Sequence, residues 1–125
     1  MKPQNIKKHN QLFGSWGEDC AAAYLEDKGY RIVARNVRTP EGEIDLIVEK
    51  EGKLVFVEVK ARSHGHNGYP EEAITEEKQE HMIDSAEYFL QEHPDYAENW
   101  RIDVVAVTGT INSLHPQIEW FEDAA

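Results

Sequence analysis

The sequence holds only one cysteine, Cys20, among its 125 residues. A lone thiol excludes an internal disulfide and the usual thiol-rich zinc sites, and it fits a reducing compartment. Long apolar runs are also missing, because no stretch approaches the roughly 20 residues that cross a bilayer. The first residues are polar, unlike the apolar centre of a signal peptide. We therefore expect a cytoplasmic protein with no membrane-spanning segment and no membrane partner.

Basic residues are few, with 13 Lys and Arg against 24 Asp and Glu, and the net charge is −11. This balance argues against a generic nucleic-acid binder, because nonspecific affinity comes mostly from basic side chains on phosphates. The excess acid is confined to residues 67–125, which carry 14 acidic and 2 basic residues, whereas residues 30–66 carry 6 and 7. The middle of the chain can therefore hold a local basic patch. Its candidate members are Arg31, Arg35, Arg38, Lys60 and Arg62.

The length and the hydrophobic content, 40%, suffice for one buried core. Neither an internal repeat nor a linker divides the chain. We predict a single domain over residues 1–125, in which residues 1–11 are polar enough to be disordered.

Hydrophobic periodicity predicts a first helix over residues 15–28, which ends at Gly29, and a second helix that is capped by Thr75 and runs to about His93. Strands are predicted over residues 30–37, 43–49, 53–61, 102–107 and 117–121. The second and third strands are separated by a short turn and should form an antiparallel hairpin. Apolar residues occupy both faces of the middle strands, so the fold class is α/β: a central mixed β-sheet flanked by helices, in the order αβββαββ.

The predicted hairpin brings carboxylates together. A turn at Glu51 and Gly52 places Asp45 opposite Glu58 and Glu43 opposite Lys60, and alternation puts all four on one face. Like charges opposite each other destabilise a sheet unless a positive charge lies between them. Hard cations such as Mg²⁺ and Mn²⁺ prefer oxygen ligands. We therefore predict that Asp45 and Glu58 bind one of these ions, with Lys60 beside it to orient or deprotonate an attacking water. The alternative is a salt-bridge network of these four residues.

The helices offer further candidates. Glu18 shares a helical face with the small residues that would approach the sheet, so its carboxylate needs a partner and is a candidate third metal ligand; the alternative is a helix-start carboxylate favoured by the dipole. Lys78 lies one turn ahead of Met82 on the apolar face of the second helix, where it could meet a phosphate. Arg35, Arg38 and Arg62 are either phosphate contacts or ordinary solvated charges.

Other polar and aromatic residues have simpler interpretations. Asp103 is expected to be structural, paired with Arg101 or a neighbour. His64 and His66 lie in a loop, and most loop histidines bind nothing. Trp16, Trp100 and Trp120 are expected in the core or at its edge rather than as platforms for base stacking.

Several short motifs carry a family resemblance. They are Gly14-Ser15-Trp16-Gly17-Glu18, Gly29-Tyr30, Arg35-Asn36-x-Arg38, Gly42-Glu43-Ile44-Asp45-Leu46-Ile47, Phe56-Val57-Glu58-Val59-Lys60-Ala61-Arg62, Glu72-Ala73, Lys78 and Arg101-x-Asp103-Val104-Val105. Together they resemble the YraN-type family of small bacterial proteins over residues 12–107. That family belongs to the restriction-endonuclease-like PD-(D/E)xK superfamily and is similar to archaeal Holliday junction resolvases. By this resemblance Asp45 matches the motif's Asp, Glu58 its acidic residue, Lys60 its Lys, and Glu18 the helix carboxylate.

These observations predict a nuclease-like domain that uses Mg²⁺ or Mn²⁺ to hydrolyse phosphodiesters in DNA, with branched DNA in repair or recombination as the expected substrate. A junction-cutting enzyme needs two active sites, so a homodimer would follow. One alternative is a nucleic-acid-binding module that keeps the fold and lacks turnover. Another is a protein-interaction domain whose acidic C-terminal half binds a basic partner.

Overall fold

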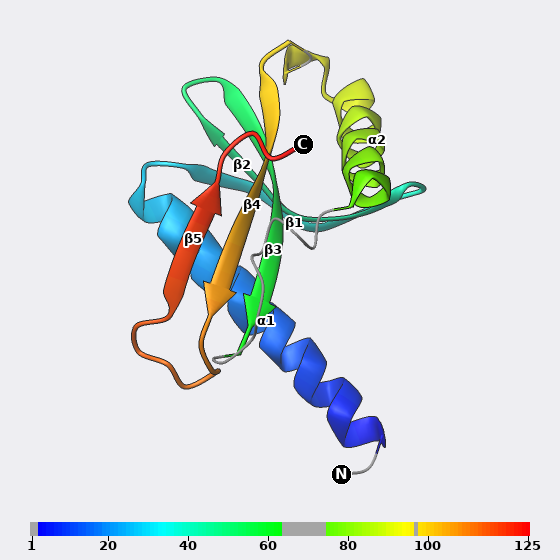
Figure 1. Cartoon of the computed structure of the whole chain (residues 1–125). Coiled ribbons are helices and arrows are strands. Elements are labelled where there is room, and N and C mark those ends of the chain that lie inside the picture. The colour runs from blue at the N-terminus through cyan, green and yellow to red at the C-terminus, as the bar shows by residue number, and fades with distance from the viewer. Residues whose placement is uncertain (1–2, 64–74, 97) are drawn as a thin grey trace.

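The computed structural model describes residues 3–63, 75–96 and 98–125 (Figure 1). Its elements are α1 (Pro3–Asp27), β1 (Arg31–Thr39), β2 (Gly42–Lys50), β3 (Lys53–Arg62), α2 (Glu76–Glu92), the short 3-10 helix η2 (Pro94–Tyr96), β4 (Trp100–Thr108) and β5 (Gln117–Phe121). The predicted α/β class and element order are confirmed. Each predicted strand is present within two residues of its expected bounds.

The sheet has five strands in the order β1-β2-β3-β4-β5. Neighbouring strands are antiparallel except for β3 and β4, which run parallel, so the sheet is mixed as predicted. The chain between β3 and β4 includes α2, as a parallel pair requires a crossover connection. Figure 1 shows α1 along one face of the sheet and α2 at the other.

The helix α1 begins at Pro3, about three turns earlier than the predicted start at residue 15. Residues 3–11, which we expected to be disordered, are therefore helical, while residues 1–2 lie outside the described part. The polar composition misled the prediction, because a helix needs an apolar stripe only where it packs. Figure 1 shows that the N-terminal part of α1 extends beyond the sheet. Proline fits the first turn, where its missing N–H has no partner to lose.

Each face of the sheet packs its own core. On the α1 side, the buried residues are Ala21, Ala22, Leu25, Leu46, Val48, Val55, Val57, Val105 and Val107. On the α2 side, they are Ile44, Ile47, Leu54, Phe56, Ala86, Phe89, Leu90 and Ile102. Alternate residues of β3 thus enter opposite cores, which accounts for its almost unbroken apolar run.

A close approach fixes α1 against β3. A Cβ added at Gly17 would lie 2.8 Å from the Cβ of Ala61, so the helix can sit this near only because residue 17 is glycine. The next residue along α1 is Glu18, which is thereby held near the sheet. None of the described helices is both long and apolar enough to cross a membrane.

Candidate metal centre

The pairing of β2 with β3 ends close to the predicted centre. The last paired residues are Leu46 and Val57, in the register predicted from the turn. Beyond them a side chain replaces the backbone ladder, because the N–H of Val59 donates a hydrogen bond of 2.8 Å to Oδ2 of Asp45. This hydrogen bond therefore joins β2 and β3 just beyond the point where their backbone pairing ends.

The strand β2 does not alternate regularly at this point. Ile44 lies in the core beneath α2, whereas Leu46, two residues later, lies in the core beneath α1. In a regular strand these two side chains would share a face. The strict alternation from which we placed Glu43, Asp45, Glu58 and Lys60 on one face therefore does not describe residues 44 to 46, although Glu43 and Glu58 line the same cavity.

Asp45 and Glu58 nevertheless meet. Burial, the negative charge of Glu58 and a side-chain hydrogen bond with Glu58 raise the pKa of Asp45 to about 7, against the opposing hydrogen bond from Val59. The charge of Glu18 adds to the same shift. Two carboxyl groups that repel each other cannot both ionise easily, so Asp45 keeps its proton to a higher pH than an ordinary aspartic acid. A cation between them would relieve the same repulsion.

Lys60 lies beside this pair. Its Nζ is 3.2 Å from Oε1 of Glu58, and the two side chains are 23% and 22% exposed. Partial burial lowers the pKa of Lys60, but a hydrogen bond with Lys78 and the charge of Glu58 outweigh it and raise the pKa above its usual value. Lys60 is therefore a charged ammonium group at the centre.

Lys78 reaches the same place from α2. Its hydrogen bond with Lys60 and the positive charge of Lys60 lower the pKa of Lys78. Thr75 supports this first turn of α2, because its side chain accepts a hydrogen bond from the backbone N–H of Lys78. The structure thus places two lysines from different elements together, one of which sequence reasoning had assigned only to phosphate contact.

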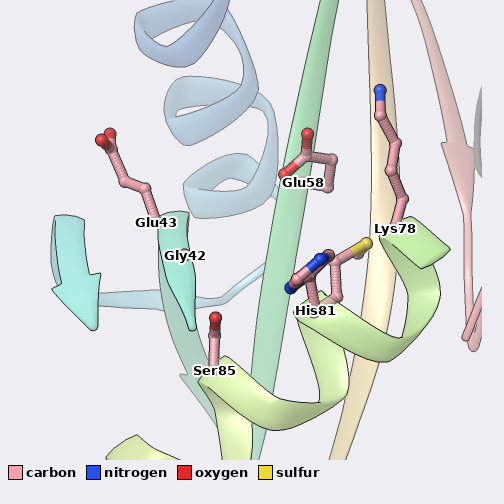
Figure 2. A pocket seen from close by; sticks show the side chains of 7 residues that line it. Gly42, Glu43, Glu58, Lys78, His81 and Ser85 are labelled. Atoms are coloured by element: carbon pink, nitrogen blue, oxygen red, sulfur yellow. The ribbon is translucent and has the colours of Figure 1, made fainter. Parts of the chain in front are cut away.

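A cavity of about 150 Å³ lies between the sheet and α2. The residues that line it come from the start of β2, from β3 and from one face of α2: Gly42, Glu43, Glu58, Lys78, His81, Met82 and Ser85. Figure 2 shows the Glu58 side chain between those of Glu43 and Lys78. The buried Ser85 accepts a hydrogen bond of 3.2 Å from Thr39, which ties α2 to the end of β1.

Sequence reasoning missed His81 and Ser85 as lining residues. The signal was present, because residues 78, 81, 82 and 85 follow the spacing of one helical face. We had interpreted this helical face only as an apolar stripe that includes Met82. Asn36 was also missed as a partner of Glu18, since a hydrogen bond between strand and helix has no sequence signature.

Glu18 faces the centre but is occupied by other partners. Burial raises the pKa of Glu18, while a hydrogen bond with Asn36 and the charge of Arg35 oppose that rise. Its Oε1 is 3.8 Å from a guanidinium nitrogen of Arg35. No group of three or more His, Cys, Asp or Glu side chains that could hold a metal ion occurs among the described residues. Direct ligation by Glu18 together with Asp45 and Glu58 is thus not preformed.

The predicted basic patch is largely engaged with acids. Arg35 forms an ion pair of 2.8 Å with Asp19. Arg31, at the start of β1, pairs with Glu49. Arg38 is exposed on β1, opposite Glu43 in the ladder. Arg62 ends β3 with a partly buried side chain, and its carbonyl accepts a hydrogen bond of 2.9 Å from the N–H of Gly109. Phosphate contacts by these arginines remain predictions.

Asp103 and the three tryptophans lie where the sequence predicted them. Asp103 is fully buried and structural, as expected, and it pairs with Arg101 at 2.9 Å. Trp16 and Trp120 pack against the core beneath α1, and Trp100 packs against the core beneath α2. His64 and His66 lie outside the described residues.

The chain is similar to a large set of bacterial proteins. Residues 17–107 match the profile of an uncharacterised protein family, UPF0102. A UPF0102 protein of Chloroherpeton thalassium is 44% identical over 98 residues, which cover 78% of this chain and 76% of that protein. One of Clostridium perfringens is 35% identical over 119 residues, covering 95% and 98%. One of Acinetobacter baumannii is 36% identical, covering 91% and 94%. These matches confirm the family resemblance found in the sequence.

Proposed function

We propose that this chain, which belongs to the uncharacterised protein family UPF0102, is a metal-dependent nuclease that hydrolyses phosphodiesters in DNA. The proposal rests on one observation: Asp45 and Glu58 share a site in which burial and mutual repulsion raise the pKa of Asp45 to about 7. Such a strongly perturbed acid, beside a second carboxylate and a lysine, is typical of a functional site.

The donor set fits Mg²⁺ or Mn²⁺. Both ions are commonly bound through one or two carboxylates, with water and substrate phosphate in the other positions. Asp45 and Glu58 would be the protein ligands, and Glu18 would reach the ion through water. When bound, the ion would supply a Lewis acid for the phosphate and lower the pKa of a water molecule.

The residues of the chain then have separate tasks. Glu58 fixes the Lys60 ammonium 3.2 Å from its own carboxylate, and thereby beside the position of the reacting phosphate. A fixed positive charge there stabilises the negative charge that develops on the phosphoryl oxygens. Lys78 lies near Lys60 and lines the cavity, and it is the candidate contact for the next phosphate.

The substrate is a more detailed part of the proposal. We propose branched DNA in repair or recombination, by analogy with the resolvases that the sequence resembles, and a homodimer if the junction is cut on two strands. The lone Cys20 supports a cytoplasmic site of action. Because Arg35 is already paired with Asp19 of α1, fewer basic side chains are left to contact phosphates. We therefore expect weak affinity for linear duplex DNA.

The test combines cleavage with metal binding on one preparation. Linear, nicked, flapped and four-way DNA are incubated with Mg²⁺ or Mn²⁺ and, in parallel, with chelator. We expect cleavage of at least one branched form with metal only, and its loss in Asp45→Asn. The exposed residue Asp84 of α2 provides a matched control, so Asp84→Asn should cut like the wild type.

Metal binding is read from thermal unfolding. A ligand that binds only the folded state raises the melting temperature by mass action, so Mn²⁺ should stabilise the wild type and Asp84→Asn but not Asp45→Asn. The shift should grow between pH 6 and pH 8, because the ion competes with the proton on Asp45. Equal shifts in all three proteins would place the ion elsewhere. A wild type that cuts no DNA form with either metal would leave the binding-module alternative.

A further inference from the structure

A second and larger pocket lies at another edge of the sheet. Its volume is about 540 Å³. Figure 1 shows β3 and β4 ending side by side. The pocket lies at this edge, because its residues Ser63 and 109–112 directly follow the two strands. The residues used below come from α1, from the end of β3 and from the loop after β4: His9, Asn10, Phe13, Ser63, Thr110 and Asn112. Ligands often bind beyond the carboxyl ends of parallel strands, and this volume is within the usual range for small-molecule sites.

One wall of the pocket is a ladder of flat rings along α1. The rings of His9 and Phe13 are nearly parallel, with an interplanar angle of 8° and centroids 6.3 Å apart. The rings of Phe13 and Trp16 are also stacked, at 17° and 5.3 Å. Trp16 packs on the core beneath α1, so it anchors the ladder while His9 and Phe13 reach the pocket.

The opposite wall is held by the loop after β4. The N–H of Gly109 donates to the carbonyl of Arg62 at 2.9 Å, which fastens the loop to the end of β3. The N–H of Thr110 donates to Oγ of Ser113 at 2.8 Å, and the N–H of Ser113 donates to the carbonyl of Thr110 at 2.8 Å. This closed turn presents Thr110, Ile111 and Asn112 to the pocket.

The side chains that line the pocket indicate the kind of ligand that it could bind. None of the described lining residues is Asp, Glu, Lys or Arg. A phosphate or a metal ion would therefore find no charge of the opposite sign from those side chains. The flat rings offer a stacking surface, and Asn10, Ser63, Thr110 and Asn112 offer both hydrogen-bond donors and acceptors. A neutral planar heterocycle with polar edges fits this combination.

We propose that this pocket binds an unpaired nucleobase of a nucleic-acid strand, by stacking on the ring ladder that ends in His9 and by hydrogen bonds from Asn10, Ser63, Thr110 and Asn112. Every base has a flat face, so stacking tolerates any sequence. The nucleic-acid source of the base rests on the proposed function. Ser63 follows Lys60 by three residues, about 10 Å along an extended chain, so a strand that crosses the end of β3 reaches from the metal centre to the pocket.

The experiment measures binding in chelator, where cleavage cannot interfere. The probes are a fluorescent single-stranded decanucleotide, a fully paired duplex of the same sequence, and AMP. The wild type should bind the single strand more tightly than the duplex or AMP. Phe13→Leu keeps an apolar side chain and removes the middle ring that supports His9 in the ladder, so the affinity for the single strand should fall roughly 5- to 100-fold. Tyr88→Leu removes a partly exposed ring from α2 and should leave this affinity unchanged.

Asn112→Leu is a second variant, which fills the pocket from the exposed loop without touching the ring ladder. It should weaken binding as well, and the melting temperature of each variant establishes that it is folded. Wild-type affinity for the single strand in both folded variants would overturn the proposal, as would tight binding of AMP alone. If the wild type binds the single strand through the ladder but cuts no DNA form with either metal, the proposed function has failed and the base pocket stands.

Discussion

Asp45 accepts a hydrogen bond of 2.8 Å from the backbone N–H of Val59, and the two residues lie one and two positions, respectively, beyond the last pair of the β2–β3 ladder. The contact places a carboxylate in the gap that opens as the two strands separate. Because Glu58 precedes Val59, the same contact brings the two acidic side chains together. The end of the β2–β3 pairing just before Asp45 and Glu58 is thus what leaves room for the candidate centre.

The first prediction concerns the pH dependence of stability without metal. The pKa of Asp45 rises from 3.8 to about 7 on folding, so the folded state binds the proton more tightly than the unfolded state. This contribution is fully present below about pH 4 and is lost as the pH rises through about 7. Asp45→Asn cannot titrate and keeps an oxygen to accept the Val59 N–H. Relative to this variant, the wild type should lose on the order of 1 to 3 kcal/mol of unfolding free energy between pH 4.5 and pH 8.

Urea unfolding in chelator at several pH values measures this difference. Asp84→Asn provides the control, because Asp84 is exposed on α2, and its curve should follow that of the wild type. Parallel curves for the wild type and Asp45→Asn would show that folding does not raise the pKa of Asp45.

Much of the fold was predictable because its signals are local. Alternation, Gly29 and the Thr75 cap fixed the element order, and a short turn fixed the register that pairs Leu46 with Val57. The extension of α1 to Pro3 was not predictable from an apolar stripe, because that part of the helix lies beyond the sheet.

The candidate centre was predictable to a lesser degree. The hairpin register correctly brought Asp45 near Glu58, although β2 lacks the regular alternation that we had assumed. Contacts between distant elements could not be read from spacing. The proximity of Lys60 to Lys78 and the ion pair of Arg35 with Asp19 depend on how the helices dock on the sheet. Docking is set by the two cores, and sequence spacing within one element carries no information about it.

The second prediction separates chemistry from structure at Lys60. Lys60→Ala leaves Asp45 and Glu58 in place, so the Mn²⁺-induced rise in melting temperature should persist. Loss of the ammonium beside the reacting phosphate should slow cleavage by a factor on the order of 10² or more. Lys53→Ala, at the other end of β3, is the matched control and should cut like the wild type.

A purely structural Lys60 would give the reverse pattern. Removing one partner of a buried ion pair destabilises a protein by roughly 3 to 5 kcal/mol, with no specific loss of cleavage in the folded fraction. Melting temperature, metal affinity and cleavage rate measured together decide between the two. A folded Lys60→Ala protein that binds metal and cuts at the wild-type rate would remove Lys60 from the mechanism.

The third prediction uses two glycines of α1. Gly17→Ala would place its Cβ 2.8 Å from that of Ala61, so the helix must move away from β3 and the free energy of unfolding should fall by about 1 to 3 kcal/mol. At Gly14 an added Cβ meets nothing within 4 Å, so Gly14→Ala should instead stabilise the protein by about 0.5 to 1 kcal/mol. Chemical unfolding measures both. A Gly17→Ala protein as stable as Gly14→Ala would show that α1 does not depend on this close approach.

The fourth prediction concerns the buried carboxylate of Asp103, which is fully inaccessible to solvent. Arg101 donates to its two oxygens at 2.9 and 3.1 Å, and the indole N–H of Trp120 and the backbone N–H of Asp123 each donate at 2.8 Å. Asp103→Ala would leave these donors without their acceptor, and the partly buried Arg101 would lose its main counter-charge. We expect a loss of roughly 3 to 5 kcal/mol of unfolding free energy.

Glu122 offers a matched control for this cluster. It also pairs with Arg101, at 3.1 Å, but its side chain is 56% exposed, so Glu122→Ala should change stability by less than about 1 kcal/mol. Asp103→Asn retains one oxygen as an acceptor and should fall between the two. Because Trp120 donates to Asp103, its fluorescence should report the loss in Asp103→Ala and stay unchanged in Glu122→Ala. Equal stability of Asp103→Ala and Glu122→Ala would show that the buried ion pair does not hold β5 and the C-terminal residues to β4.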